Sequence, residues 1–212
     1  MKKRISSIFC LLAFAITSMQ AKDYNVKDYG AIGDGKTLDH IAINATIDTC
    51  VAHGGGRVVL PAGTYLCGSI RMKSNVELHL MTGSKILAAP ASMKAYDEAE
   101  EFEGTAYQDG GHTYFKNSLI YAIGANDVSI TGRGMIDGEG LTRRDTENGG
   151  NLHGGNIGTG DKAIAFKQCR NILIRDVTIY RGGHFGIIVT GCELGTIDNV
   201  IVDTNRDGID ID

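Results

Sequence analysis

The sequence predicts an all-β protein, a single-stranded right-handed parallel β-helix with a capping helix near its N-terminus. Glycine gives the first indication, because 29 of the 212 residues are glycine and only two are proline, whereas the usual glycine share is ~7%. This composition is typical of many short strands joined by tight corners. The second indication is an internal repeat near 23 residues with short, alternating, β-branched strands. Leucine-rich repeats have a similar length, but the recurrent leucines and the helical segment that they need are missing.

The repeat is clearest in the last third of the chain. Residues 174–179 align with residues 197–202 at an offset of 23, and Cys169 aligns with Cys192 at the same offset. Each coil of a β-helix lies ~4.8 Å from the next, as neighbouring strands do, so aligned residues become neighbours on the surface. Weaker copies of the strand pattern occur earlier, at residues 75–80 and 127–130.

Residues 1–21 have the pattern of a cleaved secretory signal. Basic residues at positions 2–4 precede an apolar run over residues 5–16, and a short polar stretch leads to Lys22. This order is typical of an export signal, and the apolar run is too short for a transmembrane anchor. We therefore expect an exported protein, periplasmic or extracellular, with no membrane span and with a mature chain that begins near Lys22.

Residues 38–53 are expected to form the capping helix. Apolar residues recur there at helical spacing, Asp39 is placed as the N-cap, and glycines 54–56 end the helix. A strand over residues 57–60 and a turn over residues 61–63 follow. The expected apolar face consists of Leu38, Ile41, Ala42, Ala45 and Val51.

The C-terminal end of the chain carries no comparable cap. An open end of a coil stack exposes strand edges and apolar core, so a complete β-helix needs a cap at each end. The chain stops on Asp212 within a strand. The fold is therefore expected to be truncated at its C-terminal end, with residues 22–212 forming the N-terminal part of a longer β-helix domain.

Two irregular stretches, residues 89–117 and 138–161, are longer than the corners of a solenoid require. Loops of this length on a rigid stack commonly form the walls of a binding groove. Disordered insertion is the alternative, and it is equally open for the glycine-rich second stretch.

The alignment of the last strand allows one residue of slack at its corner. Residues 186–189 then align with residues 208–211, and His184 is expected to lie over Asp207. A histidine at such a glycine-rich corner either contacts a substrate or faces solvent, and the sequence leaves both open.

This last strand carries three carboxylates. A period of two directs its isoleucines inward and Asp210 and Asp212 outward, and the glycine after Asp207 allows a corner that brings this carboxylate beside them. Crowded outward carboxylates indicate a bound cation, a shared proton or general acid/base chemistry. For Asp212 a solvated acidic face is an equally good interpretation.

Charge and cysteine content narrow the possible partners. Without the signal, 18 basic and 25 acidic residues give a formal net charge of −7. A nucleic-acid partner is therefore not expected, and an acidic sugar would need a local basic patch. Disulfides and buried free thiols both remain open for the remaining cysteines, which are Cys50, Cys67, Cys169 and Cys192.

Several motifs resemble known families. Residues 28–35 and 55–65 resemble the start of the pectate-lyase-like β-helix superfamily, which includes hydrolases, lyases and viral spikes. Residues 130–140 and 205–210 resemble glycoside hydrolase family 28, the polygalacturonases and rhamnogalacturonases. The resemblance extends over nearly all of the chain after residue 21. Within the second motif, Arg206 departs from the family pattern, which has threonine there.

The resemblance implies a catalytic role for Asp207, as a carboxylate that helps to activate the attacking water. It places Asn205 and Asp210 near the bound sugar, and it implies no metal and no cofactor. The family's paired aspartates, a Gly-His-Gly and an Arg-x-Lys would lie beyond Asp212. By itself the chain is therefore expected to bind poorly and to catalyse nothing.

Other basic residues are candidates for binding a uronate carboxylate. Arg206 is one, next to Asp207, and an arginine can bind a carboxylate with two hydrogen bonds. Arg143, Arg144 and Lys162 are further candidates, although ordinary solvent-facing surface is the favoured interpretation for these three.

Three functions remain to be distinguished. The first is an exported, inverting, metal-free glycoside hydrolase that acts on pectic polysaccharide or oligosaccharide, a monomer in its full-length form. The second is a calcium-dependent pectate lyase with Asp207, Asp210 and Asp212 as oxygen ligands. The third is a non-catalytic carbohydrate-binding β-helix, or adhesin.

Overall fold

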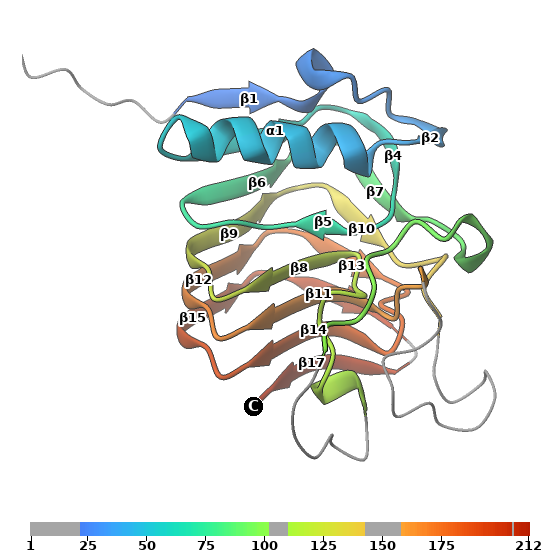
Figure 1. Ribbon diagram of the computed structural model, residues 1–212, viewed down its shortest axis with the longest axis vertical. Helices are drawn as coiled ribbons and strands as arrows, with labels where there is room; N and C mark the ends of the chain where they lie inside the picture. Colours follow the sequence, from blue (N-terminus) through green and yellow to red (C-terminus); the bar gives the residue numbers. More distant parts are fainter. Residues whose placement is uncertain (1–21, 102–109, 143–157, 205) are drawn as a thin grey trace, which may run out of the picture.

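The structure, a computed structural model, describes residues 22–101, 110–142, 158–204 and 206–212. The predicted parallel β-helix is confirmed, because the strands form three parallel sheets and each turn of the chain after the first adds one strand to each sheet (Figure 1). The signal predicted over residues 1–21 lies outside the described residues. Within the described part of the chain, no helix is long and apolar enough to cross a membrane.

The first sheet consists of β1 (Asp23–Asn25), β3 (Gly56–Leu60), β6 (Val76–Leu80), β9 (Asn126–Gly132), β12 (Arg170–Arg175) and β15 (Glu193–Asp198). The second sheet consists of β2 (Asp34–Leu38), β4 (Gly63–Cys67), β7 (Ser84–Ala88), β10 (Met135–Asp137), β13 (Thr178–Tyr180) and β16 (Ile201–Asp203). The third sheet consists of β5 (Ile70–Arg71), β8 (Ile120–Ile123), β11 (Lys162–Lys167), β14 (Phe185–Thr190) and β17 (Asp207–Ile211). The helices are α1 (His40–Ala52) and the short 3-10 helices η1 (Val26–Tyr29), η2 (Ala91–Met93) and η3 (Gly110–His112).

The strand register confirms most of the predicted repeat. Ile174 pairs with Ile197 at the predicted offset of 23, and the weaker copies pair as well, with Val76 opposite Val128. Inward side chains of successive coils therefore stack into columns, such as Leu78, Ile130 and Ile174 in the first sheet, all fully buried. Burial of each such side chain stabilises the fold by roughly 1.5–3 kcal/mol.

One predicted neighbour was wrong. Asp207 pairs with Phe185 and not with His184, although Ile187 does pair with Ile209 as expected. The offset is still 23 at the end of the second sheet, where Tyr180 pairs with Asp203. The earlier coil therefore has one residue more than the later coil, and this residue lies between Tyr180 and Phe185. The sequence alignment had placed it after His184.

The tight corners depend on residues that tolerate a left-handed backbone. Asn75, Asp127 and Asn171 precede or begin successive strands of the first sheet with φ between 54° and 63°. Asparagine and aspartate adopt this conformation more readily than other non-glycine residues. The side-chain amide of Asn171 also donates a hydrogen bond to Asp127 across one coil, at 2.6 Å. The corners are thus linked from coil to coil.

The capping helix forms as predicted, but it buries a different face. Helix α1 lies across the start of the coil stack (Figure 1) and buries Ile43, Thr46, Ile47 and Cys50, whereas Ile41 of the expected face is 68% exposed. Contacts with neighbouring strands decide which face of α1 is buried, because the spacing of the apolar residues alone allows either face. Asp39 is the N-cap residue of α1 as predicted, but its carboxylate accepts hydrogen bonds from the backbone of residues 32 and 33 and caps no helical N–H.

The described part of the first irregular stretch covers the outer face of the third sheet. Its Phe115 is fully buried in a second apolar cluster, outside the coil, with Tyr121, Ala165, Phe185 and Ile188. The described ends of the second stretch pack against the first, since the backbone N–H of Tyr96 donates to the carbonyl of Gly158. The described parts of both stretches therefore pack onto the stack or onto each other.

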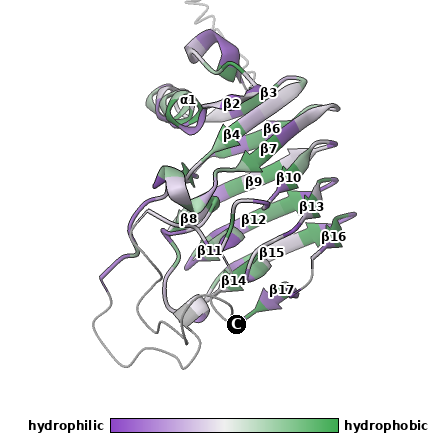
Figure 2. Ribbon diagram, turned by 90° about the vertical axis from the view of Figure 1, so that its right-hand side faces the viewer, coloured by the Kyte–Doolittle hydropathy of each residue, from purple (hydrophilic) through white to green (hydrophobic). Residues whose placement is uncertain are grey.

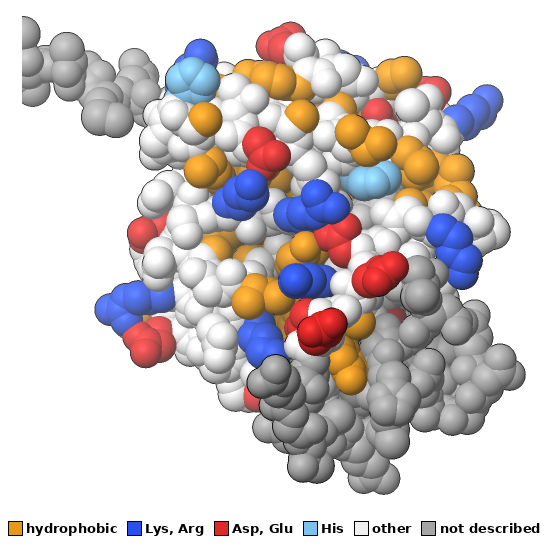
Figure 3. Space-filling view, viewed as in Figure 1, with side chains coloured by type: hydrophobic (Ala, Val, Ile, Leu, Met, Phe, Trp, Pro, Cys, Tyr) orange, Lys and Arg blue, Asp and Glu red, His pale blue; other side chains and the backbone are white. Residues whose placement is uncertain are grey.

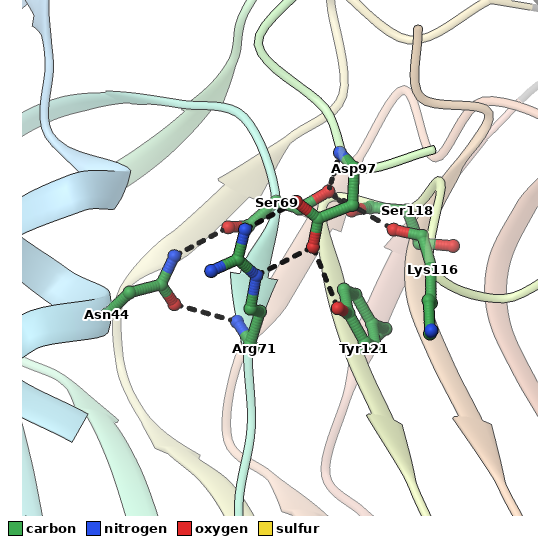
Figure 4. Close-up of polar contacts among 7 residues, drawn as sticks. All are labelled: Asn44, Ser69, Arg71, Asp97, Lys116, Ser118 and Tyr121. Atoms are coloured by element: carbon green, nitrogen blue, oxygen red, sulfur yellow. Dashed lines mark hydrogen bonds and ion pairs between the residues drawn. The ribbon is translucent and has the colours of Figure 1, made fainter. Parts of the chain in front are cut away.

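The covering segment is fixed by a polar network (Figure 4). The guanidinium of Arg71 donates two hydrogen bonds to the carboxylate of Asp97, at 2.7 and 2.6 Å, and the hydroxyl of Tyr121 donates a third at 2.7 Å. Ser69 donates to the carbonyl of Ser118 at 2.8 Å and accepts from the backbone N–H of Asp97. Burial alone would raise the pKa of Asp97, but these hydrogen bonds outweigh it and hold the pKa below its usual value.

The last described coil, β15, β16 and β17, lies at the end of the stack opposite α1 (Figure 2). Its inward residues Ile209 and Ile211 pair with Ile187 and Val189 of the main core, yet they are 47% and 70% exposed. Leu194 and Ile201, which is paired with Thr178, are also exposed.

Candidate active site

The carboxylates of β17 lie where the sequence predicts. Asp207 is exposed and pairs with Phe185, and Asp210 pairs with Ile188. Both of these partners belong to the outer apolar cluster, so Asp207 and Asp210 both follow its outward direction. The isoleucine between them pairs with Ile187 of the main core. The predicted separation of an apolar inner side and an acidic outer side is therefore confirmed.

His112, a residue that the sequence reasoning missed, joins this acidic side. Its Nε2 lies 3.3 Å from Asp210 Oδ2 and 3.9 Å from Asp212 Oδ2. The hydroxyl of Thr190 lies 3.3 Å from the same oxygen of Asp212. The histidine comes from η3, in a stretch without any repeat, so the sequence offered no signal that could place it.

The same three side chains are the described residues best arranged to hold a metal ion. One ligand atom from each of His112, Asp210 and Asp212 lies within 4.8 Å of the other two. Imidazole and carboxylate are ligands for several divalent ions. Exposed acidic groups also gather without any ion, and His112 already pairs with Asp210.

Two predicted surface residues are buried below β17. His184 is 2% exposed, so the alternative of a solvent-facing corner is wrong. Its ring stacks on the ring of Phe185, with 4.4 Å between the ring centroids, and its backbone N–H donates to the backbone carbonyl of Asp161. Lys162 is fully buried and pairs with Asp161 at 2.5 Å, so the expectation of solubilising surface is wrong for it. A buried charge of this kind is stable only with a partner.

A hollow of about 360 Å³ lies beside the corner that leads into β17. Its polar lining includes Glu139, Tyr180, Arg181, Asp203 and Thr204. The guanidinium of Arg181 is fixed by two hydrogen bonds to the buried Asp137, at 2.9 and 2.7 Å, and these bonds raise the pKa of Arg181. It also lies over the Tyr180 ring.

The hollow combines an aromatic ring with charged groups of both signs, so it offers both an apolar surface and polar groups to a ligand. The sequence reasoning missed this group. The repeat offset of 23 would have placed Tyr180 next to Asp203, and the two residues are paired in the structure. No motif, however, marks either residue.

The remaining predicted residues are placed only in part. Arg206 is half-buried in the corner before β17. Asn205, Arg143 and Arg144 lie outside the described residues. On the face that carries the third sheet, basic and acidic side chains are intermingled (Figure 3), and Arg71 among them is already paired with Asp97.

The arrangement can support acid/base chemistry at a sugar. An exposed carboxylate such as Asp207 can accept a proton from water, provided that the water is held by other groups. The hollow and the covering loops supply polar groups on either side of the strand that carries it. This geometry is that of a shallow site on the outside of a β-helix.

A family model described as "Rhamnogalacturonase A/epimerase, pectate lyase-like" matches residues 24–212. The chain belongs to this family. The match covers every described strand apart from the first residue of β1, and it confirms the pectate-lyase-like resemblance of the opening motifs.

Named relatives support the narrower resemblance as well. The chain is 33% identical over 134 residues to an exo-poly-alpha-D-galacturonosidase of Dickeya chrysanthemi, covering 60% of this chain and 21% of that enzyme. It superimposes with a TM-score of 0.70 on a hyperthermoactive exopolygalacturonase of Thermotoga maritima, at 26% identity, covering 89% of this chain and 49% of that one. The predicted similarity to polygalacturonases is therefore confirmed.

A relative of another kind covers more of the chain. The plasmin and fibronectin-binding protein A of Streptococcus pneumoniae is 30% identical over 184 residues, which are 86% of this chain and 23% of that protein. The chain thus spans less than a quarter of the length of either curated relative.

Proposed function

We propose that the protein is an exported glycoside hydrolase that cleaves pectic polysaccharide or oligosaccharide with inversion and without a metal. The observation that carries the proposal is the exposed, outward Asp207 at the start of β17, three residues after Thr204, which lines the hollow of Tyr180 and Arg181. The relatives named as galacturonosidase and exopolygalacturonase support a pectic substrate. Because the chain spans 21% of the Dickeya enzyme, the activity is proposed for the whole protein.

In this proposal Asp207 belongs to the base group. Its carboxylate accepts a proton as water attacks the anomeric carbon, while a separate carboxylic acid protonates the leaving oxygen. Asp210, Asn205 and Arg206 bind the sugar beside it. His184 is too buried to act as a direct ligand, so its proposed part is to hold Phe185 under Asp207.

The test measures reducing ends released from polygalacturonate by the complete gene product. Asp207→Asn is expected to lower kcat by roughly 10²–10⁴-fold, the usual contribution of a general base, with an unchanged melting temperature. The matched control is Asp203→Asn, a nearby exposed carboxylate of the preceding strand, which is expected to change KM more than kcat. Full activity of Asp207→Asn would overturn the proposal.

A calcium-dependent lyase is the second candidate. Two of its three expected oxygen ligands, Asp210 and Asp212, lie together beside His112, whereas Asp207 is not part of this group. A lyase forms an unsaturated product that absorbs in the ultraviolet, whereas a hydrolase does not. Loss of activity in EDTA, together with such a product, would favour the lyase. Activity retained in EDTA with a saturated product would exclude it.

A binding protein is the third candidate, supported by the pneumococcal relative that covers 86% of the chain. Its expected signature is binding of pectin oligosaccharides by the complete gene product without any turnover. Binding that is unchanged in Asp207→Asn, combined with absent turnover in the wild type, would favour this candidate over both enzymes.

A further inference from the structure

Cys169 and Cys192 lie directly over one another in consecutive coils. The preceding strands pair Lys167 with Thr190, and the following strands pair Arg170 with Glu193. Both corners between these pairs contain two residues, so the second residue of one corner faces the second residue of the other. Neighbouring parallel strands are ~4.8 Å apart, and a disulfide needs Cα atoms ~4.4–6.8 Å apart.

The backbone holds the two corners in the same shape. Gln168 and Gly191, the residues before the two cysteines, both have a left-handed φ, of 52° and 59°. The backbone N–H of Gln168 donates to the carbonyl of Thr190, and that of Glu193 donates to the carbonyl of Cys169. The two cysteines are therefore matched in both position and backbone direction.

The sulfur of Cys192 is directed toward the coil of Cys169, whereas the thiol of Cys169 donates to the carbonyl of Lys167 in its own coil, at 3.3 Å. The backbone N–H of Cys169 donates to Sγ of Cys192 at 3.2 Å. The thiol of Cys192 is within 3.6 Å of the carbonyl of Phe166, in the coil of Cys169. Cys169 is buried, whereas Cys192 is half-exposed, so solvent reaches the pair from one side.

We propose that Cys169 and Cys192 form a redox-active dithiol that closes to a disulfide between two coils, the second of which continues into β17. The half-exposed Cys192 thiolate attacks a small-molecule disulfide such as oxidised glutathione, forming a mixed disulfide and releasing one thiolate. Cys169 then loses its proton and attacks the sulfur of Cys192, which releases the second thiolate. The protein loses two protons and two electrons, and the glutathione disulfide gains them as two thiols.

The acidity of the two thiols agrees with this order of attack. A hydrogen bond from the Cys169 thiol, aided by the Cys169 backbone N–H, lowers the pKa of Cys192 to about 7, against the effect of burial. The same hydrogen bond, together with burial, raises the pKa of Cys169. A thiol with a pKa near the ambient pH is the better attacking group. By contrast, burial raises the pKa of Cys50 and of Cys67, and these two thiols serve as internal controls.

The test treats the purified protein with oxidised glutathione, blocks remaining thiols with iodoacetamide and digests it with trypsin. Cys169 falls in the peptide of residues 168–170 and Cys192 in that of residues 182–206, so the proposed bond gives one cross-linked product that dithiothreitol separates. Cys169→Ser is expected to stop at the mixed disulfide on Cys192. Cys192→Ser is expected to leave Cys169 unmodified.

A second readout is the melting temperature of the wild-type protein in its oxidised and reduced forms. The bond joins residues 23 positions apart, and closing a loop of that length is expected to raise the melting temperature by about 5–10 °C over the reduced protein. The double variant with serine at both positions should show no such difference between oxidised and reduced samples. Cross-links to Cys50 or Cys67 instead, or no reaction of Cys192, would overturn the proposal. Neither result depends on whether the protein hydrolyses pectin.

Discussion

Strands β14 and β17 are neighbours in one sheet and have nearly the same sequence pattern, but they differ at their outward positions. Both have a glycine second and an isoleucine third, and their third residues, Ile187 and Ile209, are paired. At the outward positions, β14 has Phe185 and Ile188, which the covering loop buries. In β17 the paired positions hold Asp207 and Asp210. The inner pattern therefore maintains the coil, while the outer positions change between buried apolar residues and carboxylates.

The largest expected difference between the two strands is in their inward isoleucines. Ile187→Ala is expected to lower the free energy of unfolding by about 3 kcal/mol, because it leaves a cavity in a fully buried column. Ile209→Ala should lower it by about 1 kcal/mol or less, since Ile209 is 47% exposed. Urea denaturation of the two variants measures both values. Equal losses would show that β17 is covered in solution.

The paired glycines provide a second contrast. A Cβ at position 186 would lie 2.7 Å from the carbonyl oxygen of Gly208, so Gly186→Ala is expected to cost roughly 1–3 kcal/mol of stability. At Gly208 the nearest atom, in Val202, would be 3.6 Å away and φ is not positive. Gly208→Ala is therefore expected to be neutral or to stabilise by up to about 1 kcal/mol through the unfolded chain. Thermal melts of both variants test this, and a larger loss in Gly208→Ala would contradict it.

The covering loop should depend on the ion pair of Asp97. Asp97→Asn is expected to lower stability by about 1–2 kcal/mol, a value reduced because Arg71 is half-exposed. The pKa of Asp97 is depressed in the folded state, so its contribution is present above its unfolded pKa, ~3.9, and is lost as the pH falls through the lower folded value.

Denaturation of wild type and Asp97→Asn between pH 7 and pH 2.5 measures this contribution. The difference between the two proteins should shrink below about pH 4. Asp23→Asn is the control, because its partner Arg57 and Asp23 itself are both well exposed, and its effect should stay under about 1 kcal/mol. A difference that is constant over the whole pH range would exclude the proposed role of Asp97.

The smallest expected effect is on the acidic side of β17. Asp210→Asn removes the partly exposed pair with His112 and should change stability by less than about 1 kcal/mol. Its effect on turnover should also be smaller than that of Asp207→Asn. A larger loss of stability would mean that the pair holds η3 against the sheet, which chemical denaturation of His112→Ala would then reproduce.

The sequence by itself determined the coil. Period-two strands repeating every 23 residues leave one way to bury the isoleucines, and this predicted the pairing of Ile174 with Ile197 and the outward direction of Asp210. Only the tertiary structure decided which face of α1 is buried, why Lys162 is inside, and that His112 meets Asp210. Those contacts involve segments without a repeat, or a choice between two faces of one helix. Local spacing carries no information about them, because the partner lies in a distant part of the chain.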